Sequence, residues 1–246
     1  MGTLFVVATP IGNLSDITLR ALEVLKTVDV VLAEDTRVAS KLLNHFQILP
    51  PKLVSYHQHS SDEKKAEVLS WLCAGKNVAL ITDAGTPGIS DPGNELIDFL
   101  FSEVSLAGSF HDREAPAEGA SLVSIPGASA LTSALSVCGF DVNHFIFLGF
   151  LPKKKREKLF KWLSGEASEL AFAFYDSPYR IIKTIDDLER HFPTRRIFVA
   201  RELTKMYETM YRGSISDVRV QMAAGSLKGE FVIVVEKEKR TILAQV

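Results

Sequence analysis

Short apolar runs rich in β-branched residues alternate, along the first half of the chain, with segments in which apolar residues recur every three or four positions. The first pattern predicts buried strands and the second predicts amphipathic helices. Ala66, Leu69 and Leu72, for example, lie on one face of an expected helix. The expected strands lie at 4–8, 28–33, 53–56, 78–82 and 122–125. This alternation is typical of a mostly parallel sheet whose strands are joined by flanking helices.

The second half of the chain has a different arrangement of apolar segments. Its expected strands lie at 145–148, 170–175, 196–200, 208–212 and 231–235. Only one helical segment separates the strands from residue 196 onward, which favours a mixed sheet with helices. We therefore expect an α/β protein of two domains, residues 1–126 and 127–246, with the boundary at Pro126-Gly127. Residues 105–120 lack usable periodicity and are expected to form a surface loop.

The composition fits a folded protein of this size. The chain has 246 residues, of which 46% are hydrophobic and 24% are charged, and this is enough apolar material for a well-buried core. No apolar run approaches the roughly 20 residues of a membrane span, and the first residues do not resemble a signal peptide. Cys73 and Cys138 are too few for a disulfide framework or a zinc site. We predict a soluble cytoplasmic protein that binds neither a membrane nor a metal.

The balance of charge gives no overall sign of a nucleic-acid partner. With 28 basic and 30 acidic residues the formal net charge is −2, whereas nucleic-acid-binding proteins usually carry a basic footprint. One local patch remains, because Lys153, Lys154, Lys155 and Arg156 are consecutive. Such a run either contacts phosphates or is the solvated start of a helix, and the sequence leaves both interpretations open.

Four segments that follow expected strands contain the residues most suited to chemistry, because ligands of open α/β sheets bind beyond the carboxyl ends of strands. Three of them, beginning at Thr9, Asp83 and Pro126, are rich in glycine, proline and small residues that let a ligand approach the backbone. The fourth is Glu34-Asp35-Thr36-Arg37. None contains a Walker loop, a dinucleotide fingerprint, a nucleophile elbow or a metal-ligand cluster. A cofactor held mainly by backbone groups, such as S-adenosylmethionine, fits this composition.

Nine motifs occur together over nearly the whole chain. They are Thr9-Pro10-Ile11-Gly12-Asn13-Leu14-Ser15-Asp16-Ile17-Thr18, Ala33-Glu34-Asp35-Thr36-Arg37, Ser55-Tyr56-His57, Asp83-Ala84-Gly85-Thr86-Pro87, Asp91-Pro92-Gly93, Gly149-Phe150-Leu151-Pro152-Lys153, Tyr175-Asp176-Ser177-Pro178-Tyr179-Arg180, Ala200-Arg201-Glu202-Leu203-Thr204-Lys205 and Lys228-Gly229-Glu230. With them the chain resembles the ribosomal RNA small subunit methyltransferase I family. The resemblance implies a two-domain tetrapyrrole-methylase fold, a homodimer, and S-adenosylmethionine in the cleft between the domains. It also implies 2′-O-methylation of a decoding-centre cytidine of 16S rRNA, numbered 1402 in the family's enzyme name, with the small ribosomal subunit as partner.

The same resemblance assigns cofactor-binding positions in both halves of the chain. They are Pro10, Asp83, Ala84, Gly85, Thr86, Ile89, Ser129, Ala130, Tyr175, Asp176 and Leu203. The small residues Ala84, Gly85 and Ala130 are expected to let the backbone meet the ligand. Ser129 has a second interpretation as a helix-start hydroxyl, and both roles are compatible.

Methylation of a hydroxyl by a sulfonium methyl group needs either a base or a desolvated and oriented ribose hydroxyl. Positioning in line with the sulfonium methyl supplies much of the rate, and proton removal adds about 10²–10⁴-fold. The candidates for this chemistry are Glu34, Asp35, Arg201, Glu202 and Lys205, with His57 as a further proton acceptor and Arg37 as a phosphate contact. Arg201 and Glu202 could equally form a structural ion pair, and His57 could be a surface residue. The sequence does not select one base.

Two rival functions remain at this stage. The first is a methyltransferase that acts on a carbon of a porphyrin- or corrin-type small molecule with the same fold. The second is a module that binds a nucleotide without catalysis. The charged segment Glu34-Asp35-Thr36-Arg37 and the basic residues Lys153–Arg156 favour RNA over the first. Charged residues at the strand ends, beside the expected cofactor loops, argue against the second.

Overall fold

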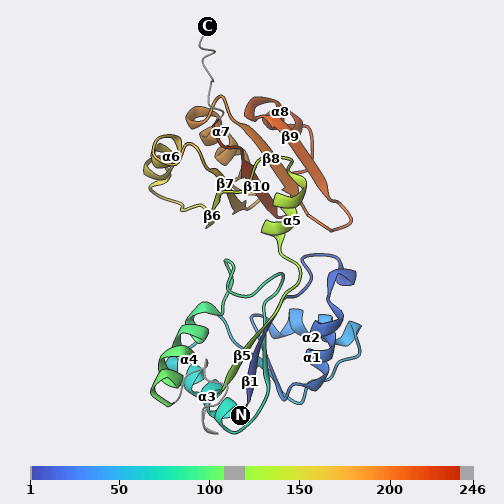
Figure 1. Cartoon of the computed structure of the whole chain (residues 1–246). Helices are drawn as coiled ribbons and strands as arrows, with labels where there is room; N and C mark the ends of the chain where they lie inside the picture. Colours follow the sequence, from blue (N-terminus) through green and yellow to red (C-terminus); the bar gives the residue numbers. More distant parts are fainter. Residues whose placement is uncertain (1, 108–119, 239–246) are drawn as a thin grey trace. The chain divides into compact units, whose positions relative to one another are not determined.

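The computed structural model describes residues 2–107 and 120–238, with only the backbone described for 104–107. The chain forms two compact units, Met1–Ser129 and Ala130–Val246 (Figure 1). Each unit is built on one sheet in the described part of the chain. Within that part, no helix is long and apolar enough to cross a membrane.

The first unit contains a parallel sheet, as predicted. Its strands are β1 (Thr3–Val7), β2 (Val30–Ala33), β3 (Leu53–Ser55), β4 (Val78–Ile81) and β5 (Ser121–Ile125). They pair in the order β3-β2-β4-β1-β5, and all the pairs are parallel. The carboxyl ends of all these strands therefore lie at one edge of the sheet.

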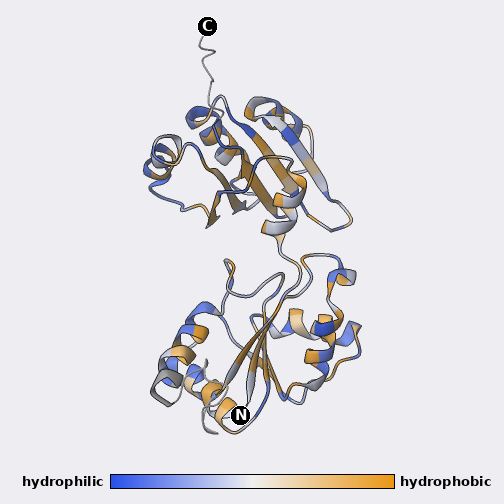
Figure 2. Ribbon diagram, viewed as in Figure 1, coloured by the Kyte–Doolittle hydropathy of each residue, from blue (hydrophilic) through white to orange (hydrophobic). Residues whose placement is uncertain are grey.

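Helices cover both faces of this sheet, which explains why its central strands are apolar throughout (Figure 2). Along β2 and β4, alternate residues point to opposite faces. Leu32 and Leu80 pack with residues of α3 (Asp62–Cys73) and α4 (Asn94–Ala107), whereas Val31 and Ala79 pack with residues of α1 (Leu19–Thr27) and α2 (Thr36–His45). The helices are η1 (Leu14–Asp16), α1 (Leu19–Thr27), α2 (Thr36–His45), α3 (Asp62–Cys73) and α4 (Asn94–Ala107).

The expected surface loop at 105–120 is corrected at both ends where the structure describes it. Helix α4 continues to Ala107, so the first three residues of the expected loop are helical. Ala120 is 4% exposed and packs in the core next to the start of β5. The apolar residues of α4 keep their helical spacing beyond residue 104, although the segment from 105 onward is rich in glycine, alanine and serine and was therefore expected to be a loop. The intervening residues 108–119 lie outside the described residues.

The second unit contains the mixed sheet that the sequence predicted. Its strands are β6 (Phe145–Phe150), β7 (Ala171–Asp176), β8 (Arg196–Arg201), β9 (Thr209–Ser214) and β10 (Phe231–Val235), in the order β6-β7-β10-β8-β9. Only β6 and β7 pair in parallel, because β10 runs antiparallel to both β7 and β8, and β9 runs antiparallel to β8. Consequently β6, β7 and β8 end at the same edge. The helices are α5 (Ala130–Val137), α6 (Arg156–Ser164), α7 (Ile181–His191) and α8 (Ile215–Ala223).

Candidate functional site

The structure brings together three of the predicted loops in the first unit. Strands β4, β1 and β5 are neighbours, so the segments that follow them start side by side. The Thr9 N–H donates to the Gly85 carbonyl at 2.8 Å, and the Gly85 N–H donates to the Thr9 carbonyl at 3.0 Å. The Thr86 hydroxyl donates to the Ala128 carbonyl at 3.1 Å. Two backbone bonds and one side-chain bond thus hold these loops in a fixed arrangement beyond the sheet.

Gly85 is central to this arrangement. Its φ of +86° lies in the left-handed region that side chains disfavour, so the bend needs glycine. A Cβ at this position would lie 3.4 Å from Ile11 Cγ2. Ala84 beside it is exposed, and Ile89 is 41% exposed, whereas Pro10 is buried. The loop therefore offers small, accessible residues on a stiff backbone.

An acidic cluster lies at the ends of β2 and β4. The Asp35 N–H donates to Asp83 Oδ1 at 3.1 Å, and Asp35 Oδ1 caps α2 by accepting the Arg37 N–H at 2.8 Å. The Arg37 guanidinium also pairs with the Asp35 carboxylate, although the Arg37 side chain stays 86% exposed. Hydrogen bonds from Arg37 hold the pKa of Asp35 at about 2. Asp35 is thus a weak proton acceptor and a good helix cap.

Glu34 differs from its neighbour in its electrostatic environment. Burial raises the pKa of Glu34, and the negative charges of Asp83 and Asp35 raise it further, against the opposing effects of a backbone hydrogen bond from Asp83 and, less, of His57. A carboxylate with a raised pKa binds a proton more readily near neutral pH. Among the carboxylates that the sequence singled out, Glu34 is the one whose surroundings suit it to accept a proton.

In the second unit, Arg201 is committed to the protein's own backbone. Its side chain donates to the Lys228 carbonyl at 2.6 Å and to the Tyr207 carbonyl at 3.0 Å, and the residue is 8% exposed. These contacts tie the segment after β8 to the segment before β10. The structure places Arg201 as a brace for two loops at the sheet edge.

Glu202 and Lys205 form an ion pair in the same loop. Glu202 Oε1 accepts from Lys205 Nζ at 3.0 Å and from the Glu230 N–H at 2.9 Å. Burial by itself raises the pKa of Glu202, but the Glu230 N–H and the Lys205 ammonium outweigh it, so the pKa lies below its usual value. Burial lowers the pKa of Lys205, but bonds to Glu230 and Glu202 raise it overall. The ion-pair partner of Glu202 is Lys205, not Arg201.

The backbone of this loop is unusual. Glu202 and Thr204 have φ values of +52° and +65°, which are uncommon for residues with side chains. A Cβ at Gly229 would lie 2.5 Å from Glu202 Oε1. Leu203, between the two left-handed residues, is 8% exposed. Close contact between Gly229 and the Glu202 side chain therefore fixes the turn that carries Leu203.

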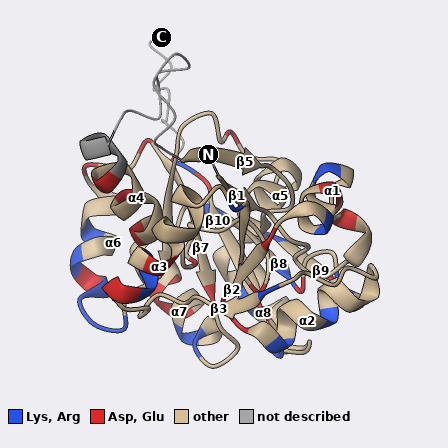
Figure 3. Ribbon diagram, turned by 90° about the horizontal axis from the view of Figure 1, so that it is seen from below, with Lys and Arg blue, Asp and Glu red and all other residues tan. Residues whose placement is uncertain are grey.

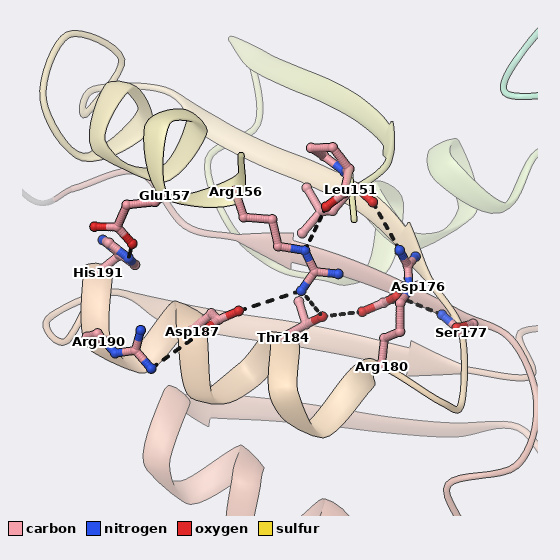
Figure 4. Close-up of polar contacts among 11 residues, drawn as sticks. Leu151, Arg156, Glu157, Asp176, Ser177, Arg180, Thr184, Asp187, Arg190 and His191 are labelled. Carbon is pink, nitrogen blue, oxygen red and sulfur yellow. Dashed lines mark hydrogen bonds and ion pairs between the residues drawn. The ribbon is translucent and has the colours of Figure 1, made fainter. Parts of the chain in front are cut away.

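Asp176, at the end of β7, is almost fully buried. Its carboxylate accepts from the Ser177 N–H at 2.9 Å and from the Thr184 hydroxyl at 2.5 Å, and it pairs with Arg180 at 2.8 Å (Figure 4). Tyr175 beside it packs edge-to-face with Phe150, with ring centroids 5.6 Å apart. The Asp176 carboxylate is thus occupied by its own unit.

The basic run before α6 divides into two parts. Lys153, Lys154 and Lys155 are exposed, and Figure 3 shows basic residues on α6 and on the loop before it. Arg156 instead bonds to the Pro152 carbonyl and to the Thr184 hydroxyl, at 2.9 and 3.1 Å (Figure 4). Its side chain is 13% exposed. Arg156 therefore anchors the loop that presents the three lysines.

The remaining predicted cofactor positions, Ser129 and Ala130, lie at the junction of the units, where Ala130 begins α5. Among the described residues, no group of three or more His, Cys, Asp or Glu side chains could hold a metal ion.

Comparison with known proteins fixes the family. The sequence profile of the tetrapyrrole (corrin/porphyrin) methylases matches residues 3–219. The chain belongs to this family. A ribosomal RNA small subunit methyltransferase I from Synechocystis is 44% identical over 96% of this chain and 79% of its own length. The protein of the same name from Thermotoga maritima is 41% identical over 95% of this chain and 98% of its own length. The resemblance to the ribosomal RNA small subunit methyltransferase I family is therefore confirmed, and this chain is a methyltransferase.

A solved structure supports the fold of this methyltransferase. The uroporphyrin-III C-methyltransferase from Thermus thermophilus, complexed with S-adenyl homocysteine, has a TM-score of 0.61 at 16% identity. The similarity covers 96% of this chain and 97% of that one. At this identity the likeness concerns the fold, which confirms the predicted tetrapyrrole-methylase architecture.

Sequence reasoning missed several residues that organise the methyltransferase. Thr184 lies eight positions after Asp176 in the chain and joins it to Arg156, and nothing in a lone threonine signals this. Arg180 lies four positions after Asp176 in the chain, but Asp176 ends β7 and Arg180 precedes α7, so no helical spacing signals their ion pair. The Glu230 N–H that holds Glu202 comes from a distant strand start.

Proposed function

We propose that this protein transfers the methyl group of S-adenosylmethionine to the ribose 2′-hydroxyl of cytidine 1402 in 16S rRNA. The observation that carries the proposal is the name of its relatives, which are ribosomal RNA small subunit methyltransferases I at 41–44% identity over 95–96% of this chain. We further propose that it acts in the cytoplasm, as a homodimer, on RNA within the small ribosomal subunit.

In this proposal the loops after β1, β4 and β5 hold the cofactor in the first unit. They fit a ligand recognised through the backbone, because Gly85 is fixed at φ +86° and Ala84 is exposed beside it. When bound, the cofactor supplies a sulfonium-activated methyl group with a good leaving group. The roles of Tyr175, Asp176 and Leu203 as further cofactor contacts stay predictions, and for Asp176 the contact would have to come from its backbone.

Glu34 is the residue that we assign as acceptor of the ribose proton. An alcohol is a poor nucleophile until its proton is withdrawn, and a positioned base contributes about 10²–10⁴-fold to such a step. The raised pKa of Glu34 suits this task, whereas the pKa values of Asp35 and Glu202 are lowered by their partners. In this assignment Asp35 caps α2 beside Glu34, and the negative charge of Asp83 helps to raise the pKa of Glu34.

The edge of the second unit's sheet carries exposed cations and exposed aromatic rings, both of which suit RNA. Lys153, Lys154 and Lys155 follow β6 and have no acidic partner among the residues that the structure describes. Tyr179 and Tyr207 follow β7 and β8 at the same edge and are 96% and 70% exposed. Strand spacing puts the ends of β6 and β8 about 14 Å apart. Exposed rings on which bases stack, beside free cations, are typical of surfaces that bind single-stranded nucleic acid.

The rival substrate, a porphyrin or corrin, has support at the level of the fold alone. The solved neighbour that acts on a uroporphyrin shares 16% identity with this chain. Two proteins with one fold often act on different substrates. The relatives that are 41–44% identical to this chain over nearly its whole length are instead named ribosomal RNA methyltransferases.

The test is transfer of labelled methyl groups from S-adenosylmethionine to two acceptors. Purified small ribosomal subunits that lack the modification are one acceptor, and uroporphyrinogen III is the other. We expect label in the 16S rRNA and none in the tetrapyrrole. Label in the tetrapyrrole alone would overturn the proposed function.

A further inference from the structure

A cavity of about 270 Å³ opens in the first unit, at the ends of β3 and β4. It lies between the segment that follows β3, the loop that follows β4, and the first residues of α4. Its volume is just below the range of about 300–1,000 Å³ that holds drug-sized ligands. It therefore fits one heterocyclic ring and is too small for a tetrapyrrole.

Two residues that line the cavity, both from the segment after β3, carry hydrogen-bond donors. Burial, together with the negative charges of Glu95 and Asp62, raises the pKa of Tyr56 to about 12, so its hydroxyl keeps its proton. His57 Nδ1 accepts the His59 N–H at 3.2 Å. In the neutral ring the proton is then on Nε2, which becomes a donor.

The lining of the cavity also contains two carboxylates. Asp91 and Glu95 both line it, and Glu95 is the more available acceptor because its side chain is 63% exposed. Lys65 Nζ lies 3.8 Å from Glu95 but 3.1 Å from Asp62, which is its closer partner. Gln58, whose amide can both donate and accept, completes the polar lining.

The loop after β4 forms a preorganised wall. The Gly88 N–H donates to the Pro92 carbonyl at 3.2 Å, and Asn94 Nδ2 donates to the Gly88 carbonyl at 2.9 Å. Ser90 has a φ of +64°, a conformation that a residue with a side chain adopts only when its surroundings impose it. This rigid wall reduces the entropy that a ligand would lose on ordering the site.

The cavity adjoins the residue that we assign as the proton acceptor. Strand β3 pairs directly with β2, so the segment with His57 starts about 5 Å from the one with Glu34. His57 also interacts electrostatically with Glu34. A ring bound in the cavity would therefore hold its substituents close to Glu34.

We propose that this cavity receives the cytosine base of the target nucleotide, turned out of the RNA stack, with its ribose directed toward Glu34. Cytosine has an exocyclic amino group beside two acceptors, and Glu or Asp is a known type of acceptor for that amino group. Glu95 would accept from it, and Tyr56 or His57 would donate to the ring. Uracil would place its O4 against the carboxylate, which disfavours it. Enzymes that act on one nucleotide commonly extrude it in this way. The inference rests on the proposed function and adds the base-recognition site.

The experiment measures methyl transfer to small ribosomal subunits that carry either cytidine or uridine at position 1402. Wild type is compared with Glu95→Gln and His57→Ala. Glu103→Gln is the matched control, because it removes the same charge from an exposed position of the same helix, outside the cavity. S-adenosylmethionine affinity and melting temperature are measured for every variant, to establish that each one is folded.

We expect wild type and Glu103→Gln to prefer cytidine in kcat/KM by between about 5- and 150-fold, the discrimination of one good base contact. Glu95→Gln should lose most of that preference, and His57→Ala should raise KM for both substrates, with cofactor affinity unchanged. Equal use of cytidine and uridine by wild type, or an unchanged preference in Glu95→Gln, would overturn the cavity assignment and leave the methylation of RNA standing. Failure of wild type to methylate either subunit would instead remove the proposed function itself.

Discussion

Gly85→Ala tests the cofactor loop against a control that the chain itself provides. Gly75, between α3 and β4, has a φ of +80°, close to the +86° of Gly85. It lies at the amino end of β4, away from the loops that follow the strands. A Cβ at Gly75 meets nothing within 4 Å, and one at Gly85 meets only Ile11 Cγ2 at 3.4 Å and the Ala128 carbonyl at 3.8 Å. The two substitutions thus impose similar backbone strain with little steric difference.

A side chain in the left-handed region costs about 1–2 kcal/mol per residue. For a protein of this length that is a loss of roughly 2–8 °C in melting temperature. We expect both variants to show it. We expect only Gly85→Ala to weaken S-adenosylmethionine binding, by about tenfold or more, which corresponds to about 1.4 kcal/mol.

Titration calorimetry with S-adenosylmethionine measures the affinities, and thermal unfolding without ligand measures the stabilities. Gly85→Val should repeat the pattern with a larger loss of affinity. Equal affinities in Gly85→Ala and Gly75→Ala, at equal stability, would refute the placement of the cofactor against this loop.

Three further predictions follow from the charged groups. Glu34→Gln should lower the single-turnover rate by about 10²–10⁴-fold with unchanged cofactor affinity, and it should remove the acidic limb of the pH–rate profile. In wild type the midpoint of that limb should lie above the usual pKa of 4.5, because the pKa of Glu34 is raised. Full activity of Glu34→Gln would refute the assignment. Asp35 has a pKa lowered from 3.8 to about 2, so its contribution to stability is present above about pH 4 and is lost as the pH falls toward 2. In acid unfolding experiments, Asp35→Asn should therefore be less stable than wild type above about pH 4, and the difference should disappear as the pH falls toward 2. A difference that does not depend on pH would contradict this. Replacing residues 153–155 by alanine should reduce the slope of log K for RNA binding against log salt by about 0.7–0.9 per lost phosphate contact. Arg156→Ala should instead mainly lower the melting temperature. An unchanged slope in the triple variant would mean that the lysines are only a solvated helix start.

The alternation of apolar segments predicted the architecture of both units because burial dictates it. Strands such as β2 and β4 are covered on both faces, so their residues are uniformly apolar and are easy to recognise. Residues 28 and 29, included in the expected second strand, precede β2 instead, since Val28 caps the end of α1. Apolar character alone does not distinguish the end of a helix from the start of a strand.

Charged residues of the candidate site were harder to interpret from the sequence. Arg201 and Arg156 stand in charged motifs that suit phosphate binding, yet each bonds to carbonyls or hydroxyls of its own unit. An arginine that binds phosphate and one that braces a loop have the same side chain, and the difference lies in contacts between residues up to 28 positions apart. Asp35 likewise was a candidate base until its role as cap of α2 was visible.

The cavity close to Glu34 could not be predicted from sequence patterns, because it too depends on contacts between distant segments. Its lining comes from the segment with Tyr56 and His57 and from the loop and helix start at 88–95, which only the sheet order brings together. The motifs containing these residues were visible in the sequence. The hollow between them depends on tertiary structure, in which Gly88 and Asn94 hold the wall in place.

The most direct test of the proposed chemistry is the identity of the nucleoside that the purified enzyme makes. Small ribosomal subunits lacking the modification are incubated with S-adenosylmethionine and either wild type or Glu34→Gln, and the 16S rRNA fragment spanning position 1402 is digested and examined by mass spectrometry. We predict 2′-O-methylcytidine at position 1402 with wild type, and little or none with Glu34→Gln over the same time. A methyl group on the base, on another nucleotide, or on no RNA would contradict 2′-O-methylation of this cytidine by this protein.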